Sequence, residues 1–288
     1  MDIRSVLMGL SFALIWSSAF TSARIIVTQA PPLTVSAIRF LLAGCIAIAI
    51  ARALGQKWSL SRAEWRVVIV FGICQNAIYL GLNFVAMQTV QASLAAIIAS
   101  SMPLLVALIG WMALKDRLPR LAIIGLVVGF AGVGLIMGTR IAGQVDLFGV
   151  ALCVVGAMAL AIATLIMRGV SGSGNLFMVV GLQMLVGGVV LSVFAGLLET
   201  PRINWNTELA LAFAYTLIMP GLVATYIWFL LVERIGAVKA ATFHFLNPFF
   251  GVLTAWILLG EQLGPWDVLG VVVITIGILA VQLSRQQS

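Results

Sequence analysis

The chain has 288 residues, of which 62% are hydrophobic and only 9% are charged. A soluble domain carries about 25% charged and about 45–50% apolar residues, so this composition excludes a water-soluble globular protein and a disordered chain. The net charge of +7 comes from basic residues scattered between apolar runs, which argues against a nucleic-acid-binding surface. The composition therefore indicates a multi-pass integral membrane protein.

Charged and polar residues divide the chain into ten apolar segments, each long enough to cross the roughly 30 Å hydrocarbon core of a bilayer. Pro31-Pro32 separates the first two segments, and residues 88–91 (QTVQ) divide an uncharged run that is too long for one span. We predict an all-α integral membrane protein with ten transmembrane helices over residues 4–28, 33–53, 65–86, 91–114, 120–138, 147–168, 175–198, 209–232, 236–259 and 266–284.

The distribution of Lys and Arg predicts how these spans are oriented. With ten spans, twelve of the 16 basic residues lie on the side of the two termini and four lie on the other side. Because cytoplasmic loops are enriched in Lys and Arg, this asymmetry predicts cytoplasmic N- and C-termini. We expect the protein to lie in the inner (plasma) membrane of a bacterial-type cell.

The sequence contains an internal repeat. At an offset of 145 residues, 84–136 matches 229–281 without a gap, with thirteen identical pairs that include Pro103/Pro248 and Trp111/Trp256. Further upstream the offset is 144 residues, where Leu160 stands in the place of Trp16. Each repeat therefore holds five spans, an odd number, so the second copy enters the membrane from the opposite face. We predict two inverted-topology five-helix repeats, 1–140 and 141–288, within one membrane domain.

Three stretches of sequence resemble the drug/metabolite transporter superfamily, in its ten-helix EamA-type branch. They are residues 16–40, with WSSAF, Arg24 and AIRF; residues 92–118, from ASLAA to LKDRL; and residues 240–263, from AAT through Asn247-Pro248 to LLGEQL. The resemblance covers nearly the whole chain, and overall likeness is greatest to bacterial amino-acid exporters of the YddG type. It implies a secondary transporter that exports small metabolites, favouring aromatic and other neutral amino acids, by alternating access through a central cavity.

Prolines near the middle of spans are candidates for hinges or gates. A mid-helix proline removes one backbone hydrogen bond and tends to kink the helix. Pro103 and Pro248 occupy matching places in the two repeats, which is the sequence pattern that points to a transporter's binding site. Pro220 has no partner proline, because Gln75 is its counterpart, and so predicts a hinge in one repeat only. A packing kink without ligand contact is the alternative.

Polar and aromatic side chains within the spans are candidates for substrate binding, because polar groups in a membrane face protein or a water-filled cavity. Interhelical hydrogen bonding, core packing and lipid contact are the alternatives for these residues. His244, the only histidine, either senses protons or stays neutral. The candidates are Trp16, Phe20, Gln75, Tyr79, Asn83, Ser100, Ser101, Tyr226, Trp228, Thr242, His244 and Asn247.

The sequence gives no sign of a catalytic, metal or cofactor site. Its three cysteines are isolated, and no acidic residue lies deep in a span, which argues against cationic cargo and a membrane enzyme. Drug or nucleobase export on the same fold is the alternative function, with a channel as a further one. The expected partners are a small-molecule substrate and membrane lipid, and not nucleic acid. We expect a functional monomer in which the glycines of residues 120–138 pack against residues 266–284 of the same chain, with a homodimer face as the alternative.

Overall fold

The computed structural model describes residues 2–116, 118–143, 145–166 and 175–284. The described residues are helical or in short connections and form no strand. Ten helical spans are long and apolar enough to cross a membrane, as predicted. Residues 167–168 of the sixth predicted helix, and Arg117, Arg168 and Arg285 of the orientation argument, lie outside the described residues.

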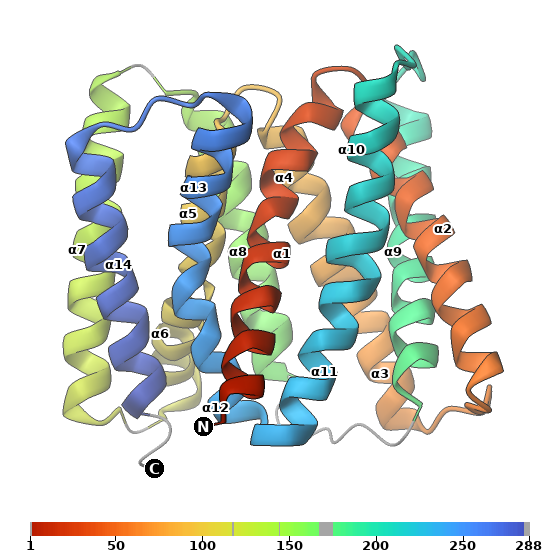
Figure 1. Ribbon diagram of the computed structural model, residues 1–288, viewed down its shortest axis with the longest axis horizontal. Helices are drawn as coiled ribbons and strands as arrows, with labels where there is room; N and C mark the ends of the chain where they lie inside the picture. Colours follow the sequence, from red (N-terminus) through yellow and green to blue (C-terminus); the bar gives the residue numbers. More distant parts are fainter. Residues whose placement is uncertain (1, 117, 144, 167–174, 285–288) are drawn as a thin grey trace.

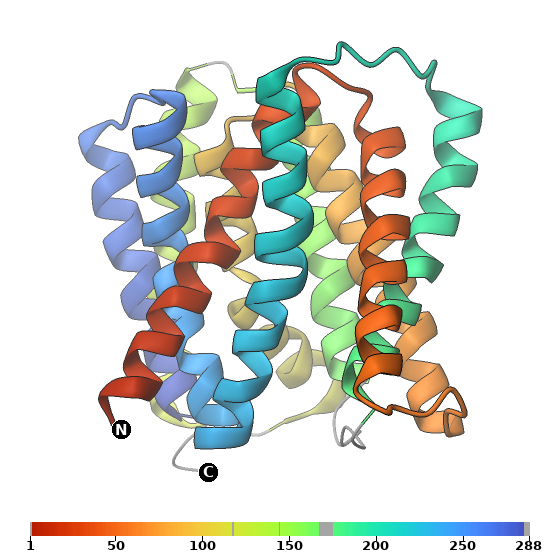
Figure 2. The ribbon, with the colours of Figure 1, turned by 45° about the vertical axis from the view of Figure 1, so that its right-hand side comes forward.

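Six of the spans are single helices: α1 (Ile3–Val27), α2 (Pro32–Ala53), α7 (Arg120–Ala142), α8 (Leu147–Ile166), α9 (Leu176–Leu198) and α14 (Pro265–Ser284). The start of α1 and the end of α14 lie at the same end of the bundle (Figures 1 and 2). We call this end the terminal face and the other end the opposite face.

The third and eighth spans each contain a stretch of π-helix. The third consists of α3 (Arg62–Phe71), η1 (Gly72–Leu80) and α4 (Gly81–Ala86), and the eighth of α10 (Thr207–Ile218), η2 (Met219–Val223) and α11 (Ala224–Ile235). Shifted by 145 residues, η2 falls inside η1. Pro220, which lacks an N–H, explains the wide turn in η2. The irregularity therefore occurs in both repeats, rather than in one as Pro220 alone predicted.

The fourth and ninth spans are broken at matching positions. The fourth consists of α5 (Ala92–Ser100) and α6 (Met102–Leu114), and the ninth of α12 (Ala237–Thr242), the 3₁₀ helix η3 (Phe243–Leu246) and α13 (Asn247–Leu259). Pro103 and Pro248 lie in the first turn of α6 and of α13, where a proline costs no hydrogen bond. Each predicted kink is thus a local irregularity just before its proline: the turn residue Ser101 between α5 and α6, and the 3₁₀ turn η3 between α12 and α13.

Close contacts between α2 and α9 demonstrate the symmetry of the two repeats. A methyl group on Gly44 would lie 2.8 Å from Leu185, and one on Gly188 would lie 2.9 Å from Leu41. At an offset of 144, Gly44 corresponds to Gly188 and Leu41 to Leu185. The two contacts are therefore the same contact with the repeats exchanged, which a pseudo-twofold axis between them requires.

The pair α7 and α14 repeats this pattern through glycines that let the backbones approach closely. A methyl group on Gly125 would lie 2.8 Å from the carbonyl oxygen of Gly277, and one on Gly270 would lie 3.2 Å from that of Gly132. The packing is within one chain. In Figure 1 this pair forms one edge of the bundle and α2–α9 forms the other, so each edge combines one helix from each repeat.

Candidate substrate cavity

A cavity of about 460 Å³ lies between the two repeats. Its wall comes mainly from α1, the third span, α9 and the eighth span, with two residues each from α2 and α8 and single residues from α6 and η3. This volume falls in the range of about 300–1,000 Å³ that small-molecule sites occupy. Both π-helical segments contribute to the wall, so the irregular backbone lies where it lines a cavity rather than against lipid.

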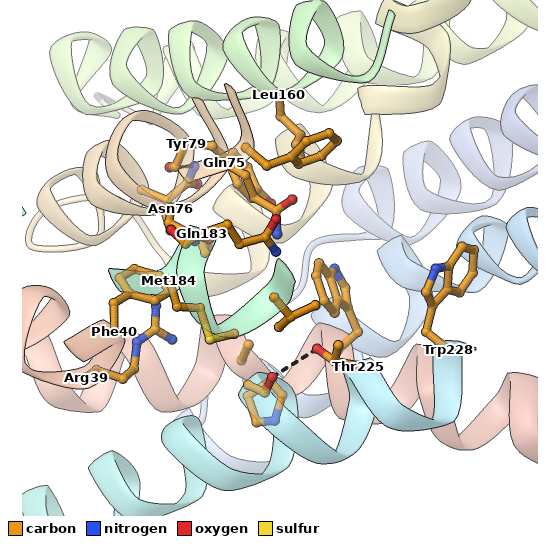
Figure 3. A pocket seen from close by; sticks show the side chains of 18 of the residues that line it. Arg39, Phe40, Gln75, Asn76, Tyr79, Leu160, Gln183, Met184, Thr225 and Trp228 are labelled. Atoms are coloured by element: carbon orange, nitrogen blue, oxygen red, sulfur yellow. Dashed lines mark hydrogen bonds between the residues drawn. The ribbon is translucent and has the colours of Figure 1, made fainter. Parts of the chain in front are cut away.

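Amide side chains gather at the middle of this cavity. Gln75 and Asn76 come from η1 and Gln183 from α9, and Figure 3 shows Gln75 and Gln183 directed toward the same part of the cavity. The Nδ2 of Asn76 donates to the backbone carbonyl oxygen of Gln183 at 3.0 Å, which links the third span to α9. Tyr79 lies one turn from Gln75 in the same wall and is buried. This patch offers uncharged donors and acceptors to a polar ligand.

An aromatic cluster lines the cavity toward the terminal face. The ring of Phe12 lies 4.9 Å from that of Trp228, 5.3 Å from His244 and 5.7 Å from Trp16, between centroids. Such distances are typical of favourable aromatic pairs. The Nδ1 of His244 is 2.9 Å from the Nδ2 of Asn247. Since an amide nitrogen can only donate, this contact makes Nδ1 the acceptor.

The two ends of the cavity differ in their access to solvent. Toward the opposite face, Phe20, Phe84 and Met87 of the wall are buried, whereas Leu176, Trp228 and several other wall residues near the terminal face are half-buried. The end of the cavity toward the opposite face is therefore closed, whereas part of the wall toward the terminal face is partly exposed.

Hydrogen bonds between spans close the opposite face. The guanidinium of Arg24 donates to the carbonyl oxygen of Met87, and Gln29 donates to Glu208 at 2.9 Å. The hydroxyl of Thr89 donates to Asp146 at 2.5 Å and thereby lowers the pKa of that carboxyl below its usual range. Two of these bonds, Gln29–Glu208 and Thr89–Asp146, join the first repeat to the second, so a separation of the repeats at this face requires breaking them.

Carboxylates also cap helices at the opposite face. Glu261, which follows α13, accepts hydrogen bonds from the backbone N–H groups of Ala92 and Ser93 at the start of α5, at 2.7 and 3.0 Å. Glu199, at the end of α9, accepts in the same way from Leu33 and Thr34 of α2. A negative charge at a helix N-terminus is favourable because it satisfies orphan donors and the helix dipole.

A cationic side chain lies at the closed end of the cavity. Arg39 of α2 lines the wall and is 6% exposed, with its guanidinium carbon 4.3 Å from the ring centre of Phe40 and 4.9 Å from that of Phe84. These are cation–π distances. The Nε and Nη2 atoms of Arg39 are buried and have no hydrogen-bond partner.

The structure places about half of the candidate residues in the cavity wall. These are Trp16, Phe20, Gln75, Tyr79, Asn83, Trp228 and His244, together with Pro220.

The remaining candidates lie outside this wall. Ser100 and Ser101 donate to carbonyl oxygens of their own helix, those of Ala96 and Ile98. Thr242 donates to the carbonyl oxygen of Lys239, and Asn247 contacts the cavity only through His244. Tyr226 is 49% exposed and stacks on Phe177, and Pro103 and Pro248 lie in the helix breaks.

Several wall residues were not among the predicted candidates. Gln183 and Met184 come from α9, Thr164 from α8 and Thr225 from α11. The repeat offers a signal for three of them. At an offset of 144, Gln183 corresponds to Arg39 and Met184 to Phe40. Thr164 likewise corresponds to Phe20, a predicted candidate.

Comparison with known proteins identifies the family. The sequence model of the EamA-like transporter family matches residues 3–138 and, separately, 147–283. The chain belongs to this family. It is a transporter rather than an enzyme, and the resemblance to the drug/metabolite transporter superfamily is confirmed. The two matches, one to each repeat, agree with the exchanged contacts along the pseudo-twofold axis.

Relatives along the whole chain carry the same general description. The transporter is 24% identical to the uncharacterized transporter YvbV of Bacillus subtilis, over 90% of this chain and 85% of that protein. It is 27% identical to the uncharacterized inner membrane transporter YedA of Escherichia coli, over 94% and 89% of the two chains. A solved crystal structure, 20% identical, superposes over 100% of both chains with a TM-score of 0.67, which supports the fold.

Proposed function

We propose that this transporter exports neutral amino acids, aromatic ones included, across the inner membrane of a bacterial-type cell by alternating access. The observation that carries the proposal is the pairing, in one cavity, of an amide patch around Gln75 and Gln183 with an aromatic cluster around Phe12 and Trp228. An apolar side chain suits the aromatic cluster, and the polar ends of an amino acid suit the amides. With cytoplasmic termini, the cavity of this conformation opens inward and can load cargo for export.

The repeat supports alternating access. Both members of each repeat-related pair of spans carry the same backbone irregularity, the π-helical stretch in one pair and the break before a proline in the other. Two similar halves in opposite orientation can exchange conformations, and this exchange turns an inward-open cavity into an outward-open one. The hydrogen bonds at the opposite face are the contacts that this movement has to break.

Counterflow in proteoliposomes tests the proposal. We expect phenylalanine, leucine and other neutral amino acids to exchange across the membrane with saturation, and nucleobases, sugars and cationic drugs to exchange much more slowly. Repeating the panel with and without a pH gradient separates proton-coupled from facilitated movement. Exchange of a nucleobase in preference to every amino acid would contradict the proposed cargo, and a flux that does not saturate would contradict a carrier.

Variants of the amide patch test the assigned site. Gln75→Leu and Gln183→Leu each remove a neutral donor and acceptor, which we expect to weaken apparent substrate affinity about 2- to 10-fold. Gln262→Leu, in the exposed connection before α14, is the matched control because it makes the same chemical change outside the cavity. Equal affinities for the control and both cavity variants contradict the site.

A further inference from the structure

Arg39 presents an unused hydrogen-bonding edge at the closed end of the cavity. The faces of its guanidinium are covered by the rings of Phe40 and Phe84. The two buried atoms without a hydrogen-bond partner, Nε and Nη2, lie on one edge of this planar group. Their parallel N–H bonds form the fork that matches the two oxygens of a carboxylate.

A buried guanidinium without an anion is unfavourable, because the free-energy cost of removing the charge from water is not offset by an ion pair. Glu64 is the only carboxylate among the described residues of the cavity wall. It lies in the first turn of α3 at the terminal face, whereas Arg39 lies about two turns from the start of α2 at the opposite face. At about 1.5 Å of rise per residue the two are separated by about 20 Å along the spans. Among the described residues, the cavity wall therefore supplies no carboxylate at the depth of Arg39.

The repeat shows that the fold does not need a cation at this place. At an offset of 144, the counterpart of Arg39 is Gln183, which also lines the cavity. The equivalent position of α9 thus holds a neutral amide, although the backbone of the two helices is alike. A charge that the fold does not require, facing a cavity and lacking an anion, is best explained by an anion that enters with the ligand.

We propose that Arg39 is the carboxylate-binding residue of the cavity, so that the cargo carries a carboxylate group. Nε and Nη2 would each donate one hydrogen bond to a carboxylate oxygen. In Figure 3, Arg39 and Phe40 lie at one edge of the cavity, on the far side of Met184 from Thr225 and Trp228. Met184 is an unbranched and flexible side chain, so it can move aside to let a carboxylate reach this buried edge.

This inference rests on the proposed function for its cavity and deepens it, because the carboxylate at Arg39 fixes the direction of an amino acid. The carboxylate end lies at the closed end, and the side chain extends toward Trp228 and His244. The same site accepts a simple aryl carboxylate without an amino group, and this difference separates the two proposals experimentally.

The test measures ligand-induced shifts in the unfolding temperature of the purified full-length chain. The probes are 3-phenylpropionate and its uncharged amide, 3-phenylpropanamide, and in parallel phenylalanine and phenylalaninamide. Because stabilisation follows ligand affinity, the concentration dependence of the shift gives the ratio of acid to amide affinity. We expect the acids to bind about 10- to 100-fold more tightly than the amides, the range for a charge-assisted bond.

Variants separate recognition from structural support. Arg39→Gln should abolish the preference for the acid, and Arg39→Lys should retain part of it because one cation remains. Arg202→Gln is the matched control, since it removes the same charge from an exposed connection at the same end of the bundle, outside the cavity wall, and should keep the wild-type ratio. A purely structural Arg39 would weaken acid and amide in the same proportion.

The outcomes also distinguish this site from the cargo proposed above. Equal affinity of the wild-type chain for acid and amide overturns the site, and this comparison needs no variant to fold. A wild-type ratio that persists in Arg39→Gln overturns it as well. If 3-phenylpropionate binds through Arg39 while no amino acid exchanges in counterflow, the carboxylate site stands and the amino-acid cargo fails. If amino acids exchange and their amides compete equally, the cargo stands and the site fails.

Discussion

The two repeats keep the same backbone but line the cavity with different side chains. Matching π-helical stretches, matching breaks and exchanged glycine contacts relate the repeats closely. In the cavity wall, by contrast, equivalent positions hold different residues. Arg39 in the first repeat corresponds to Gln183 in the second, and Trp16 corresponds to Leu160. The comparison teaches that symmetry is retained in the parts that allow the halves to exchange conformations. It is lost in the parts that touch cargo, because the cargo itself has no such symmetry.

The largest effect is expected from disrupting the symmetric backbone contacts. In Gly277→Ala the new Cβ would lie 2.5 Å from the Cα and N atoms of Gly129, so α7 and α14 would have to separate. We expect a loss of about 1–3 kcal/mol or more in unfolding free energy, the range for overpacking, measured by thermal unfolding of the purified chain. Gly134→Ala is the control, because a methyl group there meets nothing within 4 Å. Equal stability of the two variants would show that this glycine contact is not needed.

A second variant imposes symmetry on the cavity wall. Leu160→Trp gives the second repeat the aromatic residue that the first has at Trp16, and the larger ring takes up space where the cargo binds. If the ring weakens cargo binding by about 1.4 kcal/mol, the counterflow rate below saturation falls about tenfold. Ile162→Trp lies on the same helix, is 43% exposed and is outside the cavity wall, so its rate should match the wild type. An unchanged rate in Leu160→Trp would remove α8 from the binding site.

The smallest effect is expected at a backbone position that the repeats share but fill with different residues. Lys115 ends α6 with φ 56° and ψ 31°, and its counterpart Gly260 ends α13 with φ 65° and ψ 23°. A side chain makes this left-handed conformation unfavourable by roughly 1–2 kcal/mol. Lys115→Gly should therefore raise the unfolding free energy by about 1 kcal/mol, read from the unfolding temperature. The reciprocal Gly260→Ala should lower it by a similar amount, and shifts of the same sign would contradict this explanation.

Hydropathy and the internal repeat sufficed to predict the ten spans, because a lipid environment requires long apolar helices and leaves few alternatives. The same patterns could not place every site residue. Ser100 and Ser101 satisfy their hydroxyls on their own helix, and Tyr226 stacks on the outer surface near Phe177. Hydropathy does not distinguish a polar group that faces a cavity from one that bonds to its own backbone.

The π-helical stretch in the third span contains no proline. The sequence therefore predicted an irregular backbone in the eighth span only, at Pro220. Gln183 was missed because it stands alone in an apolar helix, without the regular spacing that drew attention to Gln75, Tyr79 and Asn83. Its correspondence to Arg39 through the repeat was the available signal. Comparing the repeats position by position is therefore more informative about the cavity than reading each helix alone.

The mixed helix pairs at the two edges have a consequence for how the chain is assembled during synthesis. The groove of α2 is filled by α9, and that of α7 by α14, which is synthesised after the other nine spans. Each early helix must wait in the membrane until its partner has been inserted from the other repeat. Neither half is complete as a separate product, and a chain released before α14 would leave the glycine-lined face of α7 without its partner.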